Sequence, residues 1–306
     1  MNKHYAGRFA PSPSGYMHMG NLLAMLLAWL DIRAHGGRMI FRMEDLDPAR
    51  SKAEYVQALA DDLHWLGLDW DEGFPDSAYC QSNRSGVYAD AFRTLERQGL
   101  VYPCWCTRAQ RLAASAPHPG ENHRDAGCRC ARLTASERLA LEATGRRPAW
   151  KIRVPGETVT VTDEHFGPVT QNLARDVGDF IIRRGDGVYA YQLAVTVDDM
   201  LMGVNRVVRG RDLLDSSPRQ AWLTRVLGGR PPMYCHTPLI VSGAEKMSKR
   251  LGSLSTQVLR QTHTPQSLVG QLAYMAGLLP APEPVTPREL LPLFDWASVS
   301  REDIPL

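Results

Sequence analysis

The sequence lacks both a membrane-spanning run and the apolar core of a signal peptide. Its longest apolar-rich stretch, residues 21–32, is broken by Trp29 and Asp31 and falls well short of the ~20 residues that cross a bilayer. The first residues lead directly into a segment of mixed polarity, without the hydrophobic region that a secretory signal requires. These two absences predict a cytoplasmic protein.

The sequence also lacks an excess of charge of either sign. Its 35 Lys and Arg residues are balanced by 33 Asp and Glu residues, for a formal net charge of +2. This balance excludes a positive electrostatic potential over the whole surface that would attract nucleic acid, so any RNA contact depends on local patches and shape. The 306 residues, 44% of them hydrophobic, predict one large or two modest globular domains and exclude disorder, collagen and coiled coil.

Cysteine is scarce, but four of the six cysteines are paired at short spacing. Cys104 and Cys106 form one Cys-x-Cys pair, and Cys128 and Cys130 form another, with 21 residues between the pairs. A reducing cytosol keeps such thiols free, which favours metal ligands over disulfides. Four thiolates around a tetrahedral ion suit structural zinc, so the pairs predict a Zn²⁺ site. His123 is the alternative to Cys130 as the fourth ligand.

Strand and helix signals alternate through the first hundred residues, as in a nucleotide-binding α/β sheet. Apolar periodicity and Gly36-Gly37 delimit one long helix, and the spacing of Ser51 and Glu54 predicts a capping box at the start of the next. A strand–helix–strand unit of this kind predicts a parallel sheet. The predicted elements are strands at 5–10 and 38–44, and helices at 19–35, 51–67 and 85–98.

Farther along, this pattern is interrupted once and then resumes. Residues 102–148 contain the cysteine pairs and a turn-rich run at 116–120, which indicates an insertion between sheet elements. Gly185 and Gly187 predict a hairpin turn after it. The remaining predictions are strands at 180–182, 188–190, 206–208 and 238–241, a helix at 218–227, and a helical region from about 265.

A loop rich in Pro, Gly and Ser joins the first strand to the first long helix. It reads Arg-Phe-Ala-Pro-Ser-Pro-Ser-Gly-Tyr-Met-His-Met-Gly-Asn, from Arg8 to Asn21. Prolines fix such a loop, glycines let the backbone approach a ligand, and the helix N-terminus presents free N–H groups to phosphate. Taken alone, the segment also fits a stiff turn in which His18 merely starts the helix.

A second motif follows the predicted strand at 238–241. Residues 242–250 read Ser-Gly-Ala-Glu-Lys-Met-Ser-Lys-Arg and place three cations within five residues. Such a loop is often solvated surface. A lysine pair after a sheet strand also neutralises the charge of a departing polyphosphate.

Together, the His-x-Gly loop and the Lys-Met-Ser-Lys loop in a parallel α/β frame resemble the class I aminoacyl-tRNA synthetases. The segments around Arg8, Glu44, Asp198 and Arg209 are similar to the glutamyl branch, over most of residues 5–255. Only 56 residues follow Arg250, too few for the helical anticodon-binding region of a full glutamyl enzyme. The chain therefore resembles the glutamyl-Q family, which consists of truncated glutamyl-tRNA synthetase paralogues.

The resemblance implies a fold, a reaction and its partners. The fold is a Rossmann-like catalytic domain in two halves, 1–101 and 149–255, with a zinc-binding insertion at 102–148 and a short helical C-terminal region at 256–306. The reaction converts L-glutamate and ATP, with Mg²⁺, to glutamyl adenylate and transfers glutamate to the queuosine base of tRNA(Asp). We expect a monomer.

Three other functions are weighed against this one. A minimal glutamyl-tRNA synthetase that charges the tRNA 3′ end is the main alternative. A non-catalytic zinc-containing RNA-binding module would not need His18 and Lys249, and a small-molecule nucleotidylyltransferase would not need Glu44 with the two arginines.

The family's site residues carry over to matching positions of this chain. Forked guanidinium groups of Arg8 and Arg209 suit carboxylates, Glu44 suits the α-ammonium group, and Tyr191 adds a hydroxyl. The alternative for each arginine is a buried ion pair without a ligand. The full glutamate set is Arg8, Ala10, Ser12, Glu44, Tyr191 and Arg209; the ATP set is Pro11, His18, Gly20, Asn21, Lys246, Met247, Ser248 and Lys249; and the catalytic set is His18, Lys246 and Lys249.

Some positions depart from the family pattern or stay open. Asn21 stands where many class I enzymes have a second histidine. The glutamyl-Q family often uses a Tyr and a lone Cys as its last zinc ligands, whereas this chain offers Cys128 and Cys130. Asp198 and Asp199 either orient ATP or cap the following helix.

Overall fold

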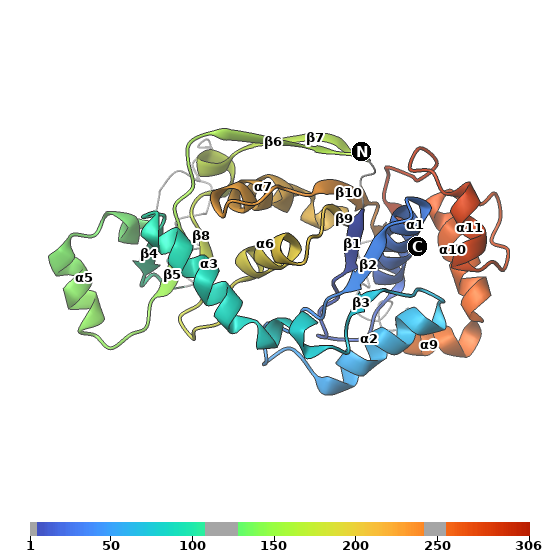
Figure 1. Ribbon diagram of the computed structural model, residues 1–306, viewed down its shortest axis with the longest axis horizontal. Helices are drawn as coiled ribbons and strands as arrows, with labels where there is room; N and C mark the ends of the chain where they lie inside the picture. The colour runs from blue at the N-terminus through green and yellow to red at the C-terminus, as the bar shows by residue number, and fades with distance from the viewer. Residues whose placement is uncertain (1–4, 108–127, 242–254) are drawn as a thin grey trace.

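The computed structural model describes residues 5–107, 128–241 and 255–306. Figure 1 shows a parallel sheet with its helices in the middle of the molecule, the segment with α5 at one end, and the C-terminal helices α10 and α11 at the other. No helix in these ranges combines the length and apolarity that a membrane span requires. The arrangement confirms the predicted α/β class.

The central sheet is assembled from two groups of parallel strands. One has the order β1-β2-β3, and the other has the order β7-β6-β10-β9, in which only β7 is antiparallel to its neighbour. The groups meet where Asn205 N–H donates to Ala6 O (3.0 Å) and Ala6 N–H donates to Asn205 Oδ1 (2.9 Å). The strands are β1 (Ala6–Phe9), β2 (Arg38–Phe41), β3 (Glu72–Gly73), β6 (Thr158–Asp163), β7 (Gly167–Asn172), β9 (Arg206–Gly210) and β10 (Met233–Thr237).

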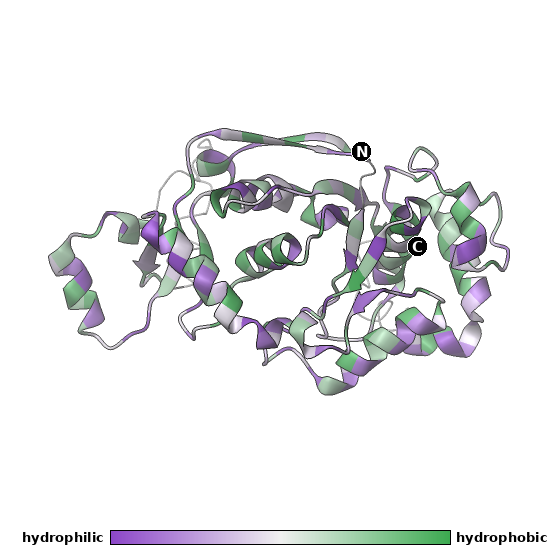
Figure 2. Cartoon of the chain, in the orientation of Figure 1, coloured by the Kyte–Doolittle hydropathy of each residue, from purple (hydrophilic) through white to green (hydrophobic). Residues whose placement is uncertain are grey.

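Helices cover this sheet and build the two ends of the molecule. Hydrophilic residues recur along α3 and α5 in Figure 2. Residues 265–276 form a helix, as predicted for the C-terminal region. The helices are α1 (Met19–Ala34), α2 (Ala53–Trp65), α3 (Ser85–Arg97), α5 (Ala135–Glu142), α6 (Tyr191–Leu201), α7 (Ser217–Val226), α9 (Thr256–Thr262), α10 (Pro265–Ala276) and α11 (Pro287–Leu290).

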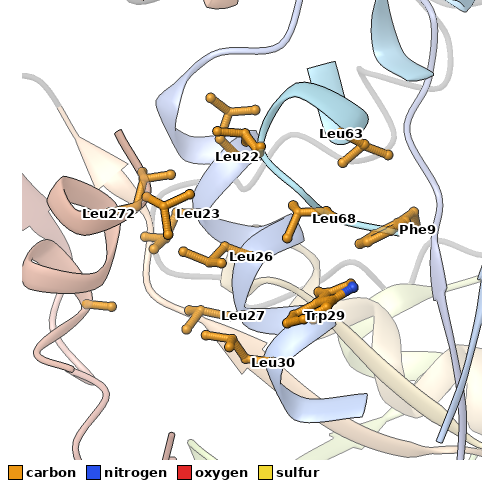
Figure 3. Close-up of a cluster of buried hydrophobic side chains, with 14 of the residues drawn as sticks. Phe9, Leu22, Leu23, Leu26, Leu27, Trp29, Leu30, Leu63, Leu68 and Leu272 are labelled. Atoms are coloured by element: carbon orange, nitrogen blue, oxygen red, sulfur yellow. The ribbon is translucent and has the colours of Figure 1, made fainter. Parts of the chain in front are cut away.

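Helix α1 is the main hydrophobic element of the fold. It confirms the predicted helix at 19–35 to within one residue, and its side chains are buried on several faces because it packs between the sheet and α10. Burial of each leucine contributes about 1.5–3 kcal/mol relative to exposure. Figure 3 shows its residues Leu22, Leu23, Leu26, Leu27, Trp29 and Leu30 together with Phe9, Leu63, Leu68 and Leu272.

The predicted capping box at Ser51 is wrong. Helix α2 begins at Ala53, after Lys52, and Ser51 Oγ donates instead to the carbonyl oxygen of Asp47 at 3.0 Å. The backbone N–H of Ser51 donates to the same oxygen at 3.1 Å. Ser51 therefore closes a turn that precedes the helix, and its hydroxyl is not available as a cap.

The predicted strand at 238–241 covers only a minor element. The main strand here is β10, which pairs in parallel with both β9 and β6, while β11 (Ile240–Val241) pairs with β12 (Ile304–Pro305) near the C-terminus. Met-Tyr-Cys-His-Thr shows no strand periodicity, because a parallel strand inside a sheet is buried on both faces.

A separate antiparallel sheet carries the cysteine-containing segment. Its order is β4-β5-β8, with β4 (Val101–Cys104), β5 (Ala149–Ile152) and β8 (Phe180–Arg183). The predicted turn after β8 is confirmed, since Ala190 N–H donates to Ile182 O at 2.9 Å, but Val188–Ala190 contributes only a bridge between Arg183 and Tyr189.

Candidate active site and metal centre

Four residues expected to bind glutamate come together at one edge of the central sheet. Arg8 lies near the end of β1, Arg209 near the end of β9, Glu44 just after β2, and Tyr191 begins α6. Burial raises the pKa of the Tyr191 phenol, which also feels the charges of Glu44, Arg209 and Arg8. Because parallel strands end on the same edge, residues distant in sequence meet here.

The two arginines are held differently. Arg8 Nη1 donates to Val208 O at 3.0 Å, and Arg8 Nε lies 3.4 Å from an Asp199 oxygen. Burial, together with the positive charges of Arg42 and Arg209, lowers the pKa of Arg8. The buried ion pair with Asp199 therefore accounts for the presence of Arg8 at this position even without a ligand.

Arg209 has no such pair among the described residues. Its Nε donates to His236 Nε2 at 3.0 Å, and its Nη2 donates to Ser217 Oγ at 3.1 Å and Leu213 O at 3.3 Å. The remaining nitrogen, Nη1, is buried and has no hydrogen-bond partner in the described part of the chain. A buried donor without a hydrogen bond is unfavourable, so a ligand that offered an acceptor to Nη1 would relieve this cost.

Arg42 forms the centre of a buried ion-pair network beneath these residues. Its Nη2 lies 3.0 Å from Glu44 Oε1, its Nη1 lies 2.7 Å from Asp199 Oδ1, and its Nε lies 3.8 Å from Asp198 Oδ2. Burial alone would lower the pKa of Arg42, but these three carboxylates raise it above its usual value. Arg42 was not among the site residues expected from the sequence; a charged residue that follows an apolar strand directly is the signal that could have identified it.

Asp198 and Asp199 do not cap a helix. Both lie inside α6, and Asp198 accepts hydrogen bonds from Gln81 Nε2, Arg84 Nε and Tyr88 Oη at 2.7–2.8 Å. The helix-capping alternative is therefore wrong for both residues. Their observed contacts hold arginines around the site.

The loop after β1 lies against Glu44. Glu44 N–H donates to Pro11 O at 3.0 Å, and Lys52 N–H donates to Pro13 O at 3.2 Å. Ala10 is half-buried and Ser12 is exposed in this loop. The backbone of the loop is thus fixed next to the carboxylate, with Ala10 and Ser12 on either side of Pro11.

His18 and its neighbours form the start of α1. His18 is the N-cap residue, and its backbone N–H donates to Asn21 Oδ1 at 3.1 Å. Gly20 leaves room for the imidazole, because a Cβ there would lie 3.2 Å from His18 Cε1. Burial lowers the pKa of His18, which favours the neutral ring. Asn21 therefore has a capping role in place of the family's second histidine.

The segment that follows the Lys-Met-Ser-Lys motif returns to His18. Ser255 forms an antiparallel bridge with His18, and Thr256 N–H donates to Met17 O at 2.9 Å. Lys246, Met247, Ser248 and Lys249 themselves lie outside the described residues. The contacts of Ser255 and Thr256 place the segment that follows the motif against the start of α1.

The four paired cysteines converge on one point. Cys104 Sγ lies 3.3 Å from Cys128 Sγ, and Cys106 Sγ lies 3.7 Å from Cys128 Sγ and 3.6 Å from Cys130 Sγ. All four sulfur atoms lie within 4.8 Å of one another. A Zn–S bond of about 2.3 Å gives tetrahedral S–S edges of about 3.8 Å, so the cluster fits such an ion. His123 lies outside the described residues.

The surroundings of the cluster support it as a metal centre. Trp105 N–H donates to Cys130 Sγ at 3.4 Å, and Tyr102, Trp105 and Leu133 are buried around the thiols. Burial and the neighbouring thiols raise the pKa of Cys106 to about 11. A metal ion that replaces these protons removes the repulsion between four thiolates.

Two buried residues next to Arg209 were not anticipated from the sequence. His236 on β10 contacts Arg209, and Asp163 at the end of β6 contacts His236 at 2.6 Å. No short spacing connects positions 163, 209 and 236. The only local signal is a histidine within a strand that is otherwise compatible with complete burial.

Comparisons with known proteins match these features. A family model for "tRNA synthetases class I (E and Q), catalytic domain" matches residues 6–282. The chain is 48% identical over 308 residues to a glutamyl-Q tRNA(Asp) synthetase from Symbiobacterium thermophilum, covering 97% of this chain and 94% of that protein. It is 44% identical over 302 residues to one from Deinococcus radiodurans, covering 97% of each.

Solved structures agree with the fold. A glutamate tRNA ligase from Elizabethkingia meningosepticum, in complex with its amino acid, superposes with a TM-score of 0.83 at 23% identity, covering 99% of this chain and 67% of that one. A glutamate-tRNA synthetase from Elizabethkingia anophelis gives 0.84 at 22% identity, covering 99% and 68%. With the family match over most of its length and its identity to these relatives, the chain belongs to the class I glutamyl and glutaminyl tRNA synthetase family, in the glutamyl-Q tRNA(Asp) synthetase branch.

Proposed function

We propose that this protein activates L-glutamate with ATP and transfers the glutamyl group to the queuosine base in the anticodon loop of tRNA(Asp). The observation that carries the proposal is the meeting of Arg8, Glu44, Tyr191 and Arg209 at one sheet edge. Relatives that are 44–48% identical and named for this reaction support the choice of acceptor.

Glutamate binding follows from charge complementarity. The buried Nη1 of Arg209 and the guanidinium group of Arg8 meet the substrate carboxylates, and Glu44 meets the α-ammonium group. Tyr191 offers a hydroxyl group for a hydrogen bond, while Ala10 and Ser12 flank the substrate from the loop after β1. A substrate carboxylate gives Arg209 Nη1 the acceptor that the described residues do not supply.

ATP lies across the carboxyl edge of the sheet between the two motifs. Pro11, Gly20 and Asn21 belong to the first side, and Met247 and Ser248 to the second. A glutamate carboxylate oxygen attacks the α-phosphorus, and the bond to pyrophosphate breaks. His18 donates to the α-phosphate, and Lys246 and Lys249 stabilise the departing pyrophosphate.

Two metal ions complete the proposal in different roles. Mg²⁺ bound together with ATP would reduce the negative charge of the phosphates during the displacement. Cys104, Cys106, Cys128 and Cys130 would hold a structural Zn²⁺, which would crosslink the segment that carries them. In the second step the acyl group passes from the adenylate to a hydroxyl of the RNA, and AMP leaves.

ATP–pyrophosphate exchange tests the activation step. We expect exchange to depend on glutamate and not on glutamine or aspartate, with and without tRNA compared in parallel. Lys249→Ala should keep the fold and glutamate binding but lower exchange by about two to three orders of magnitude, the typical loss for one preorganised charge-stabilising donor. Exchange close to that of the wild type would contradict the role of Lys249.

Transfer of labelled glutamate tests the acceptor. We expect labelling of tRNA(Asp) that contains queuosine and none of the unmodified transcript. The matched control is the same modified tRNA without its 3′-terminal nucleoside, which should still be labelled. Labelling of tRNA(Glu) that requires an intact 3′ end would instead indicate the minimal charging enzyme.

A further inference from the structure

Three buried side chains from three adjacent strands form a hydrogen-bonded series that ends at the substrate edge. Asp163 Oδ2 lies 2.6 Å from His236 Nδ1, and His236 Nε2 lies 3.0 Å from Arg209 Nε. Asp163 is 1% exposed, His236 is 0% exposed and Arg209 is 6% exposed. His236 and Arg209 are direct cross-strand neighbours in the parallel pairing of β10 with β9.

The contacts of this series determine the tautomer of His236. An arginine Nε–H is always a donor, so His236 Nε2 must accept and its proton resides on Nδ1, facing Asp163. Burial lowers the pKa of His236, although Asp163 opposes this shift, and the ring is therefore neutral. Despite burial, hydrogen bonds from His236 and Phe166 keep the pKa of Asp163 below its usual value.

Asp163 is itself held in place by the backbone. Its Oδ1 accepts from the N–H groups of Phe166 at 2.8 Å and His165 at 3.1 Å, in the turn that follows β6. This leaves Oδ2 directed at His236. The carboxylate therefore has one orientation. Its hydrogen bond fixes the imidazole of His236, which in turn fixes Arg209 Nε.

The result is a guanidinium group fixed on two of its three nitrogens. His236 holds Nε, Ser217 Oγ and Leu213 O hold Nη2, and Nη1 alone has no partner among the described residues. A side chain with many rotamers is thus reduced to a single position before the ligand arrives. Such preorganisation lowers the entropic cost of binding and aligns the fork for a carboxylate.

We propose that Asp163 and His236 are positioning residues that orient Arg209 for the carboxylate of the amino-acid substrate. This inference deepens the proposed function and rests on it, because it takes glutamate as the ligand of Arg209. Neither residue touches substrate. Each acts through the atom of Arg209 or His236 to which it is hydrogen-bonded.

A pair of His236 variants separates positioning from burial. In His236→Gln the amide oxygen can take the place of Nε2 and accept from Arg209, whereas in His236→Asn the shorter side chain reaches Asp163 but not Arg209. We expect His236→Asn to raise the KM for glutamate about tenfold or more, and His236→Gln to raise it about threefold or less. Only the glutamine keeps a hydrogen bond to the Arg209 guanidinium group, and hydrogen bonds to charged groups are the stronger ones. The KM for ATP should stay within about twofold in both variants, because neither change reaches the ATP side of the edge.

Asp163→Asn tests the tautomer. An amide donor facing Nδ1 moves the imidazole proton to Nε2, where it opposes the Nε–H of Arg209. This variant should therefore resemble His236→Asn in its KM for glutamate. Trp70→Phe is the control, since it removes one hydrogen bond to Phe74 O outside this series and should change only thermal stability.

The outcomes distinguish this inference from the proposed function. If wild-type protein shows no glutamate-dependent exchange, the proposed function fails and this inference fails with it. If the wild type is active and His236→Asn and His236→Gln have equal KM values for glutamate, the positioning role alone is overturned. A fall in kcat and stability without a change in KM would assign the two residues to folding only, which also overturns the proposal.

Discussion

At the residue scale, the two arginines of the site differ in how much they depend on substrate. Arg8 is paired with Asp199, which is paired in turn with Arg42, so a bound carboxylate adds to an existing network. Arg209 has hydrogen bonds to neutral groups only, in the described part of the chain, and one buried nitrogen without a partner. Charge compensation for Arg209 therefore depends on the ligand more strongly than for Arg8.

Replacement of Arg209 should consequently affect glutamate and little else. We expect Arg209→Ala to raise the KM for glutamate by about two orders of magnitude, since loss of one partner of a buried charge pair costs about 2–5 kcal/mol. Arg209→Lys should recover little, because an ammonium group cannot bond His236 and Ser217 while it reaches a carboxylate. Steady-state exchange at varied glutamate and varied ATP checks this; equal activation of glutamine by the wild type would contradict it.

At the element scale, the N-terminus of α1 combines capping with a small residue. Asn21 caps the backbone of His18, and Gly20 leaves the space that the imidazole occupies. The antiparallel bridge from His18 to Ser255 then ties this helix end to the segment after the lysine motif. One helix terminus thus holds both His18 and the segment that begins at Ser255.

Gly20→Ala should separate stability from activity. A Cβ at 3.2–3.3 Å from the His18 ring shifts the imidazole slightly, so exchange should fall by about 3- to 10-fold, as expected for a slightly misplaced catalytic group. The melting temperature should not fall, because alanine favours helix over glycine by about 1 kcal/mol. Asn21→Ala provides the opposite control, with lower stability from the lost cap. Unchanged exchange in Gly20→Ala would contradict the role of His18.

The cysteine cluster belongs to an element that is separate from the parallel sheet. We expect about one zinc ion per chain, lost in Cys104→Ser, with unfolding confined to the β4-β5-β8 sheet and its surroundings. Elemental analysis and the exchange of amide hydrogens measure both results. Protein purified without chelator that contains no zinc would contradict the assignment, and His123→Ala should retain the metal if Cys130 is the fourth ligand.

Zinc retention should also depend on pH in a defined direction. Because burial and neighbouring thiols raise the pKa of Cys106 to about 11, the metal-free cluster binds protons at neutral pH, and zinc must displace them. Apparent zinc affinity should therefore decrease as the pH falls. Competition with a chromophoric chelator between about pH 6 and pH 8 measures this dependence, and an affinity that is constant across that range would contradict it.

At the scale of the whole molecule, one buried ion pair connects three regions. Asp31 near the end of α1 accepts from Arg206 Nη2 on β9 at 2.7 Å and from Trp296 Nε1 of the C-terminal segment at 2.7 Å. Figure 1 shows the C-terminal helices beside α1, at the end opposite to the cysteine cluster. These contacts hold the C-terminal region against the catalytic sheet.

Asp31→Asn should lower stability without changing the site. Removal of one partner from a buried pair costs about 3–5 kcal/mol, and Arg206 would keep only Glu164. The melting temperature should fall by several degrees, while the KM for glutamate measured well below that temperature stays within about twofold of the wild type. A changed KM at low temperature would show that Asp31 also influences the site.

Local chemistry determined much of this protein in advance. The leucine periodicity of α1, the Gly185–Gly187 turn, the two Cys-x-Cys pairs and the loop before His18 are each readable within a window of about 30 residues or fewer. Helices and turns depend mainly on neighbours in sequence, and four thiols require a common ligand wherever the chain brings them together. For these features the residue order alone is sufficient.

The tertiary structure decided what depends on partners distant in sequence. The hydroxyl of Ser51 donates to the carbonyl of Asp47 and does not cap α2, and β10, between β9 and β6, carries no periodicity because it is buried on both faces. Asp163, Arg209 and His236 are separated by at least 27 positions and meet only because their strands are adjacent. Their buried hydrogen bonds form only when the sheet is assembled, because the packing of the strands, and not the local sequence, determines which side chains are buried and how they are oriented.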